Sequence, residues 1–320
     1  MIVFNTCDFR IPEPCVLALG TFDGIHLAHQ RLLRYCKRAA LAKGLAFVVF
    51  SFSNIPRSFL SGDHQQKLMS EPHKSAFLEK LGVNYLIHLP FTEEFARISD
   101  QDFLRLIINR TDLKLLCAGF NFRFGYHHAG DTQTLQQAGK KHGFQVRVIP
   151  PVLWNEQVVS STLIREKIRK GDLQQAHELL AHPYCFRVAV VKGKGLGRKI
   201  GFATANLEPE DRHIVIPGNG VYFCLASTAP GVDFQGLLSI GNCPSVVSEG
   251  PRIMEIHIPG FDGDLYGTSL LVVPLAFHRE QMKLTMADLI RAISSDVAAA
   301  KVFFSTWKCS DKIAGFLAVG

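Results

Sequence analysis

Short apolar segments recur through the first half of the chain, and each is separated from the next by a stretch long enough for a helix. They cover residues 16–19, 47–52, 85–89, 115–119 and 145–149. Strands joined by crossovers of this length pair in parallel. The alternation therefore predicts an α/β domain built on a doubly wound, mostly parallel sheet.

Two of the expected crossover helices have clear limits. One is predicted over residues 27–43, with Leu32, Cys36 and Ala39 on one face and arginines on the opposite face. These arginines are Arg31, Arg34 and Arg38. Another is predicted to begin at Ser99, which has Asp102 three residues on, and to run to Ile108.

The character of the chain changes after residue 160. Residues 163–182 predict two short helices hinged at Gly171, with Asp172 placed to cap the second. From residue 183 onward, short strand-like runs alternate with glycine, proline and asparagine, which predicts a compact β barrel or sandwich. A helix over residues 286–304 is expected to close it. We therefore expect two domains, residues 1–182 and 183–320.

Composition agrees with a two-domain globular protein. The chain has 320 residues, of which 47% are hydrophobic. No apolar run approaches the roughly 20 residues that span a bilayer, and the first residues lack a signal-peptide pattern, so a cytoplasmic location is expected. Eight cysteines are scattered without a CxxC pair. They predict reduced, mostly buried thiols rather than disulfides or a zinc site.

The net charge of +7 is unevenly spread. Residues 179–207 contain no acidic side chain. The basic residues there are Arg187, Lys192, Lys194, Arg198 and Lys199. A local basic loop rich in glycine fits a phosphorylated small molecule better than a long polyanion. We therefore expect neither nucleic acid nor a membrane as a partner.

The stretch "LALGTFDGIHLAHQ", residues 17–30, leads from a strand through a glycine turn into a helix. Such a junction directs backbone N–H groups and the positive end of the helix toward an anion. The turn residues expected to line this site are Gly20, Phe22, Asp23 and Gly24. His26 and His29, three residues apart, would donate hydrogen bonds to phosphate. Two alternatives are that each histidine is simply packed or solvated, or that the two bind zinc. The zinc site is disfavoured because no cysteine or carboxylate cluster accompanies the histidines.

The same stretch resembles the GxFDGxHxGHQ signature of the nucleotidyltransferase superfamily and, within it, the bacterial bifunctional riboflavin kinase/FAD synthetases. "CAGFNFRFGYHHAGD" and "VVSSTLIREKIRKGDLQQAHELLAHPY" match two further adenylyltransferase signatures of that family, in order. The resemblance implies a Rossmann-like nucleotidyltransferase domain followed by a riboflavin-kinase-like barrel. It implies phosphorylation of riboflavin to FMN, then transfer of AMP from ATP to FMN with release of pyrophosphate.

For the first domain, the resemblance implies that His26 and His29 are catalytic at the ATP phosphates. A second phosphate clamp would comprise Ser160, Ser161, Thr162 and Arg165 at a helix N-terminus. Asn121 and Arg123 would bind the flavin, whereas Phe122 and Phe124 alone would more often belong to the core. The chain departs from the family at Ala28, where glycine is usual. It also departs at residues 52–56, where "FSNIP" replaces FDPHP.

For the second domain, "VKGKGLGRKIGFATANLEP" resembles the riboflavin kinase signature, although a hairpin turn alone would also explain its glycines. The implied phosphate-binding residues are Gly193, Lys194, Gly195, Gly197 and Arg198. Thr204 and Asn206 would hold Mg²⁺. Glu255 would be the general base toward riboflavin, and Arg279 would contact the flavin. Ala203 stands where the family has proline, and Ser245 where it has threonine.

Two other functions are also compatible with these residues. A flavin-binding or regulatory protein could keep the fold with one activity lost, given "FSNIP" and Ala203. A nucleotidyltransferase for another phosphorylated alcohol could use the barrel as a binding module, but "TAN" and Glu255 disfavour it. We expect riboflavin, FMN and Mg-ATP as substrates and FAD as the final product. The sequence does not predict the oligomeric state.

Overall fold

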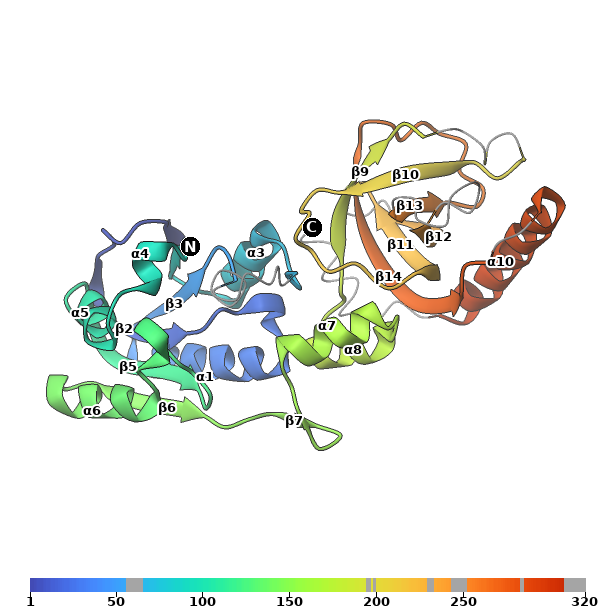
Figure 1. Ribbon diagram of the computed structural model, residues 1–320. Coiled ribbons are helices and arrows are strands. Elements are labelled where there is room, and N and C mark those ends of the chain that lie inside the picture. Colours follow the sequence, from blue (N-terminus) through green and yellow to red (C-terminus); the bar gives the residue numbers. More distant parts are fainter. Residues whose placement is uncertain are drawn as a thin grey trace. The chain divides into compact units, whose positions relative to one another are not determined.

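The computed structural model describes residues 1–55, 66–193, 197, 200–228, 233–242, 252–282 and 285–307. The chain forms two compact units (Figure 1), residues 1–67 with 71–161, and residues 68–70 with 162–320. By compactness the division therefore follows Ser161. A boundary of the functional domains after residue 182 stays a prediction.

The first unit contains a sheet of six strands in the order β1-β4-β3-β2-β5-β6, and every neighbouring pair is parallel. The strands are β1 (Ile2–Phe4), β2 (Ile11–Leu19), β3 (Ala46–Phe52), β4 (Tyr85–Leu89), β5 (Thr111–Gly119) and β6 (Gln145–Ile149). The five expected strands and their parallel pairing are confirmed. The short edge strand β1 was not expected.

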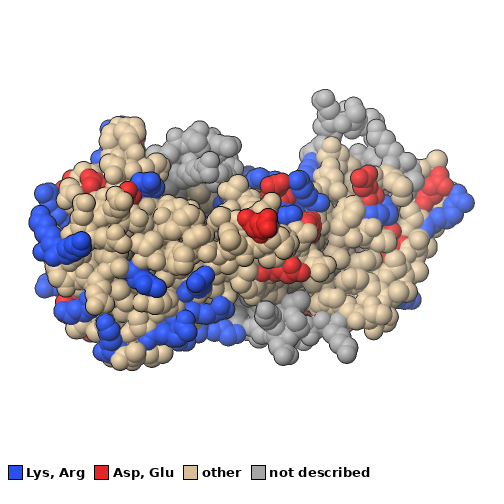
Figure 2. All heavy atoms as spheres, turned by 90° about the horizontal axis from the view of Figure 1, so that it is seen from below, with Lys and Arg blue, Asp and Glu red and all other residues tan. Residues whose placement is uncertain are grey.

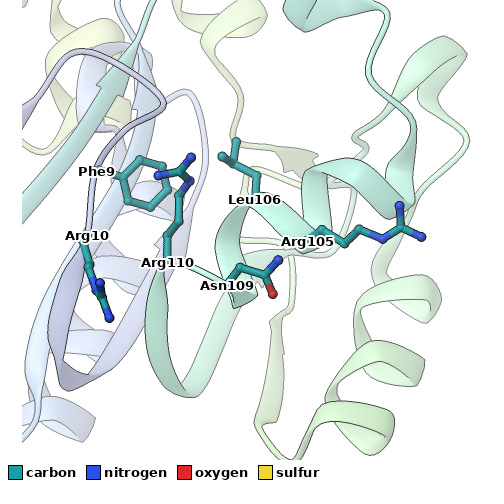
Figure 3. Close-up of a pocket in the computed structure, with 6 residues that line it drawn as sticks. All are labelled: Phe9, Arg10, Arg105, Leu106, Asn109 and Arg110. Carbon is teal, nitrogen blue, oxygen red and sulfur yellow. The ribbon is translucent and has the colours of Figure 1, made fainter.

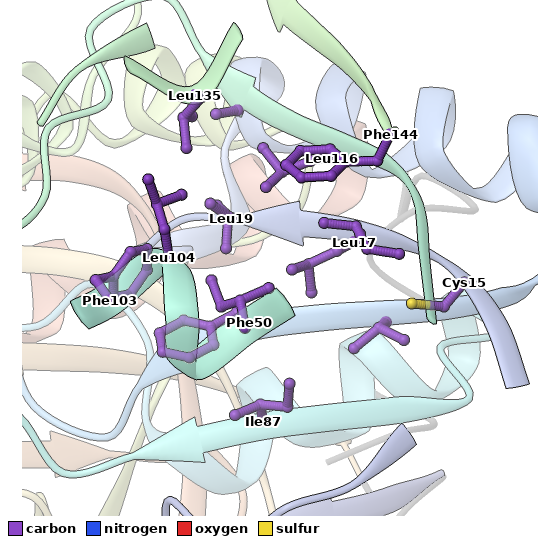
Figure 4. Close-up of a cluster of buried hydrophobic side chains, with 14 of the residues drawn as sticks. Cys15, Leu17, Leu19, Phe50, Ile87, Phe103, Leu104, Leu116, Leu135 and Phe144 are labelled. Atoms are coloured by element: carbon purple, nitrogen blue, oxygen red, sulfur yellow. The ribbon is translucent and has the colours of Figure 1, made fainter. Parts of the chain in front are cut away.

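Helices cover both faces of this sheet. On one face, α5 (Asp100–Ile108) and α6 (Thr132–His142) contribute Phe103 and Leu135 to a core that includes Leu17, Phe50 and Leu116 (Figure 4). The short α4 (Glu93–Ala96) adds Phe95 at its edge. On the other face, α1 (Leu27–Lys43) and α3 (Glu71–Leu81) pack. There burial, together with the neighbouring thiol of Cys117 in β5, raises the pKa of Cys36. The doubly wound fold is thus confirmed.

Helix α1 has the predicted limits. His26 occupies its N-cap, and Gly44, with a φ of 60°, ends it. Leu32 and Cys36 are buried. The three arginines Arg31, Arg34 and Arg38 are exposed. Figure 2 shows that basic side chains lie in separate groups over one face of the molecule.

Apart from residues 68–70, the second unit begins inside α7 (Ser161–Arg169), after its first residue, and continues with α8 (Leu173–Leu180). Gly171 lies between them with a φ of 77°, which favours glycine and explains the predicted hinge. Asp172 stands at the N-cap of α8, as expected, but its side chain makes no capping hydrogen bond. It lies 3.6 Å from the ammonium group of Lys167 instead.

Six antiparallel strands then close into a barrel in the order β10-β13-β12-β11-β14-β9. They are β9 (Phe186–Val191), β10 (Thr204–Pro209), β11 (Gly220–Ser227), β12 (Asp233–Asn242), β13 (Arg252–His257) and β14 (Ser269–Arg279). Helix α10 (Met286–Thr306) packs on the outer face through Ala300 and Phe303, against Phe223 and Leu237. The predicted barrel and its closing helix are confirmed.

Two further observations concern the described residues of both units. Within the described ranges, no helix is long and apolar enough to cross a membrane. The described cysteines are free, and five of the six are buried, as predicted. A small hairpin, β7 (Leu153–Trp154) with β8 (Gln157–Val158), precedes α7.

Candidate active sites

The turn after β2 is held in an uncommon backbone conformation. Phe22, Gly24 and Ile25 have φ angles of 49°, 75° and 37°. A positive φ at a residue with a side chain costs on the order of 1 to 3 kcal/mol, so the surroundings must hold Phe22 and Ile25 there. Both are fully buried. A Cβ on Gly20 would lie 3.0 Å from the Phe22 ring, so glycine at that position lets the ring pack against the turn.

Two histidine rings lie stacked where this turn meets α1. The ring centroids of His26 and His29 are 3.7 Å apart with an interplanar angle of 16°, and Phe22 meets His29 edge-on at 5.2 Å. Nδ1 of His26 accepts a hydrogen bond from the backbone N–H of His29 at 3.4 Å. The ring proton of a neutral His26 is therefore on Nε2.

The charge state of His29 follows from its surroundings. Burial holds the pKa of His29 well below its usual range, and the positive influence of His26 and Lys74 lowers it further. His29 is therefore neutral near pH 7. The site therefore presents at least one uncharged imidazole, that of His29, to a ligand rather than a pair of cations.

The histidines follow β2, the strand at which the order of the strands in the sheet changes direction. β3 and β4 lie on one side of β2, and β5 and β6 lie on the other. In open α/β sheets, ligands bind at the carboxyl ends of the strands at such a switch point. His26 follows β2 and Asn121 follows β5, and these strands pair through Leu19 and Ala118. The topology thus brings the predicted catalytic and flavin-binding segments to one edge.

The segment after β5 is partly fixed by an ion pair. Asn121 and Arg123 are exposed. Nη1 of Arg123 lies 3.1 Å from Oδ2 of Asp131, and Asp131 caps α6 by accepting from the backbone N–H of Thr134. Phe124 is only 6% exposed and belongs to the core, as expected for this aromatic residue taken by itself.

Sequence reasoning missed a buried ionic network at the same edge. Oε2 of Glu71 lies 2.9 Å from Nζ of Lys74 and 2.8 Å from Nε2 of His88 in β4. Lys74 also donates to the backbone carbonyl of Phe52 at 2.9 Å. Burial alone would raise the pKa of Glu71, but hydrogen bonds and charge from His88 and Lys74 hold it below its usual value. Lys74 thus fixes the carboxyl end of β3 by its hydrogen bond to Phe52, and its positive charge lowers the pKa of His29.

The loop over residues 52–56, which departs from the family pattern, is anchored by Asn54. The structure describes residues 52–55 of this loop, and Pro56 lies outside the described residues. The carboxamide of Asn54 donates to the carbonyl of Phe91 at 3.0 Å and accepts from its N–H at 2.7 Å. Asn54 therefore links the end of β3 to the segment after β4.

The predicted phosphate clamp is divided between the two units. The hydroxyl of Ser161 donates to the carbonyl of Asp23 at 3.0 Å, which fastens the β2 turn. Thr162, which is exposed, and Arg165, which is buried, belong to the second unit. Their approach to phosphate, like that of Ser160, stays a prediction.

In the second unit, the predicted metal ligands and base share one face of the barrel. Asn206 stands directly opposite Glu255, and Thr204 opposite His257. Opposed residues of an antiparallel pair project from the same face. Met254 and Ile256 alternate with them and are buried in the barrel, so these polar side chains lie on its outer surface. Burial raises the pKa of Glu255.

Gly193 and Gly197 of the glycine-rich segment closely approach two side chains of β10, those of Asn206 and Thr204. A Cβ on Gly193 would overlap the carboxamide of Asn206, and one on Gly197 would lie 2.9 Å from Oγ1 of Thr204. Nδ1 of His257 donates to the carbonyl of Ala203 at 2.8 Å, which fixes the position where the family has proline. The predicted residues Lys194, Gly195, Arg198 and Ser245 lie outside the described residues.

Arg279 makes strong contacts within the protein. Its Nε and Nη2 donate to the two carboxylate oxygens of Asp296 in α10 at 2.8 and 2.6 Å. Nε2 of His278 lies 3.0 Å from the same carboxylate, which is 4% exposed. Arg279 therefore fastens the closing helix to β14. A direct contact with flavin stays a prediction.

Further candidate sites within the described residues would be a metal cluster or a surface cavity. Among the residues that the structure describes, no three His, Cys, Asp or Glu side chains converge to hold a metal ion. A cavity of about 410 Å³ lies at the amino ends of β2 and β5, the sheet edge away from His26 (Figure 3). Its lining residues are Phe9, Arg10, Arg105, Leu106, Asn109 and Arg110. None of them is a predicted site residue.

Comparison with known proteins finds two families, matched one after the other along the chain. The FAD synthetase family matches residues 8–163, and the riboflavin kinase family matches residues 180–304. A crystal structure described as a macrolide-efflux protein from Streptococcus pneumoniae is 29% identical, with a TM-score of 0.84. The match covers 96% of this chain and 100% of that chain.

Curated relatives match over nearly their whole length. The bifunctional riboflavin kinase/FMN adenylyltransferase of Haemophilus influenzae is 33% identical, covering 93% of this chain and 96% of its own. The protein of the same name from Escherichia coli strain K12 is 31% identical, covering 92% and 95%. This chain belongs to the family of bifunctional riboflavin kinases/FMN adenylyltransferases.

Proposed function

We propose that this chain converts riboflavin to FAD in two ATP-dependent steps. The second unit phosphorylates riboflavin to FMN, and the first unit adenylylates FMN with release of pyrophosphate. The observation that supports this most is that the two family matches fall on units with different chemistry, stacked imidazoles in one and a carboxylate beside neutral oxygens in the other. We also propose a cytoplasmic location and no nucleic-acid or membrane partner.

In the adenylyltransferase step, an oxygen of the FMN phosphate attacks the α-phosphorus of ATP, and the bond to the β-phosphate breaks. We assign His26 and His29 the role of donating hydrogen bonds to phosphate oxygens as their charge grows. The N–H groups of Leu27 and Ala28 precede the first intrahelical hydrogen bond of α1 and would bind the same oxygens. The residues proposed to complete the phosphate site are Gly20, Phe22, Asp23, Gly24, Ser160, Ser161, Thr162 and Arg165. Asn121 and Arg123 would bind FMN.

In the kinase step, Glu255 accepts the proton of the terminal ribityl hydroxyl while its oxygen attacks the γ-phosphorus, and ADP leaves. A general base works best with a pKa near the operating pH, and burial shifts the pKa of Glu255 in that direction. The glycine-rich segment, with Lys194, Gly195 and Arg198, would bind the phosphates. Arg279 is proposed to support the flavin site by holding α10.

Mg²⁺ is the metal that the family implies, and the residues of β10 suit it. Thr204 and Asn206 alternate with Ala205 and so share a face. Neutral oxygen donors without a carboxylate cage fit an ion whose remaining ligands are substrate phosphates and water. When bound, Mg²⁺ would neutralise charge on the transferred phosphoryl group.

Flavin conversion by the purified protein tests the proposal. With riboflavin, ATP and MgCl₂, chromatography is expected to detect FMN first and FAD later. FMN alone would refute the second step. Tight riboflavin binding without turnover would indicate a flavin-binding protein, and riboflavin that is neither bound nor altered would refute the proposal.

Substitution of Gly193 with alanine tests the metal assignment. The added methyl group would overlap the carboxamide of Asn206 and force it from its position. We expect riboflavin phosphorylation to fall by up to about 100-fold, because a ligand displaced by about 1 Å no longer supports the reacting geometry. The measurement is kcat as a function of Mg²⁺ concentration.

The control for Gly193→Ala is the double variant Gly193→Ala/Asn206→Ala. If Gly193 acts through Asn206, the double variant is no slower than Asn206→Ala alone. Additive losses would contradict the assignment.

A further inference from the structure

Gln281 lies across the outer face of β12, close to the proposed kinase base. Its Nε2 donates to Oγ of Ser239 at 2.9 Å. A Cβ on Gly241 would overlap the Gln281 carboxamide. Glycine at position 241 therefore leaves the space that this side chain fills.

These contacts extend a row of polar side chains across the barrel. Ser239 stands directly opposite Glu255 in the pairing of β12 with β13, and Glu255 stands opposite Asn206. All three, and Gln281, are half-buried. Beyond Ser239 the strand partner is Val221, which belongs to the apolar cluster under α10. The row thus runs from the proposed metal ligand, past the base, to the closing helix.

Ser239 and Gln281 keep hydrogen-bonding capacity after they bond each other. The Ser239 oxygen accepts from Gln281, so its own proton can still be donated. Gln281 retains its carbonyl oxygen as an acceptor and one N–H as a donor. Within the described part of the chain, these groups make no other hydrogen bond. Donors and acceptors side by side match adjacent hydroxyl groups of a polyol.

We infer that Ser239 and Gln281 bind the secondary hydroxyls of the ribityl chain and thereby hold its terminal hydroxyl at Glu255. The inference rests on the proposed kinase function and names the part of riboflavin that the pair recognises. Ser239 and Gln281 would then determine substrate specificity, because an isoalloxazine with a plain alkyl alcohol would lack the hydroxyl groups that they bind.

Two substrates separate this role from a structural one. Riboflavin carries the full polyol, whereas 7,8-dimethyl-10-(5-hydroxypentyl)isoalloxazine keeps the ring system and the reacting hydroxyl without the secondary ones. Gln281→Ala is expected to lower kcat/KM for riboflavin about tenfold, the effect of losing a net hydrogen bond or two. It leaves the value for the hydroxypentyl compound unchanged. Gly241→Ala is expected to do the same, because it displaces Gln281.

Gln235→Ala is the matched control, since Gln235 is an exposed glutamine on the same strand. It is expected to change neither value. Equal losses for both substrates in Gln281→Ala would reveal a structural role and overturn the inference, as would no change for riboflavin. A wild-type protein that phosphorylates neither substrate would instead refute the proposed kinase function.

Discussion

A variant with alanine in place of His29 is expected to form FMN from riboflavin but to lose FAD formation by roughly 100-fold to 1000-fold, the usual cost of one preorganised transition-state donor. The ring is stacked on His26 and held edge-on by Phe22, so no solvent group can replace it in the same position. The measurement is the rate of FAD formation from FMN and ATP, beside the rate of FMN formation from riboflavin and ATP.

His142→Ala is the control for this variant. His142 is an exposed histidine at the end of α6 in the same unit, and its loss is expected to leave both rates unchanged. Retained FAD formation in His29→Ala would contradict the catalytic assignment. An equal fall in both rates would indicate damage to the fold rather than to one site.

The fold could be predicted largely because its elements carry local signals. Alternating apolar runs placed the strands β2 to β6, and the helix over residues 27–43 has the predicted limits because capping and amphipathic periodicity are written in adjacent residues. Strand β1 has only three residues and pairs with β4 more than 80 positions away. No local pattern records such a pairing, so it was missed.

The site residues likewise comprise some that lie in short sequence motifs and others that only the folded structure brings together. The histidine pair and the TAN segment lie within short motifs, which the sequence could reveal. The buried network of Glu71, Lys74 and His88 joins α3 to β4, and its members become neighbours only when the sheet forms. The i, i+3 spacing of Glu71 and Lys74 was visible, but it fits an exposed ion pair equally well.

Arg279 illustrates a further limit of sequence reasoning. Its position near the closing helix was apparent, but its carboxylate partner Asp296 follows 17 residues later, on a helix whose packing against β14 depends on the closed barrel. A charged side chain is assigned to a ligand or to a neighbour by tertiary structure alone. The flavin contact proposed for Arg279 has to compete with this ion pair.

Glu255→Gln is expected to lower riboflavin phosphorylation by about 100-fold to 10,000-fold, the range for loss of a general base. The amide has nearly the same shape but cannot take the hydroxyl proton. Adenylylation of supplied FMN by the first unit is expected to continue at the wild-type rate. The wild-type kinase rate should rise with pH through the raised pKa of Glu255, because only the ionised carboxylate is a base.

Stability distinguishes this catalytic loss from misfolding. Because the pKa of Glu255 is higher in the folded state, the folded protein binds its proton more tightly, so this group stabilises the fold at low pH. That stabilisation is lost as pH rises from about 4.5 through the raised pKa. Near pH 7 the buried charge is therefore unfavourable, and Glu255→Gln is expected to have a Tm no lower than wild type.

Glu208→Gln gives the matched control, since Glu208 is an exposed glutamate on the adjacent strand β10. It is expected to alter neither the kinase rate nor Tm. A Glu255→Gln variant that keeps its kinase rate would remove the general base from the mechanism.

The variants His29→Ala and Glu255→Gln are complementary, because each stops one of the two steps. FAD formation from riboflavin should return when the two variants are mixed, because FMN made by His29→Ala can be adenylylated by Glu255→Gln.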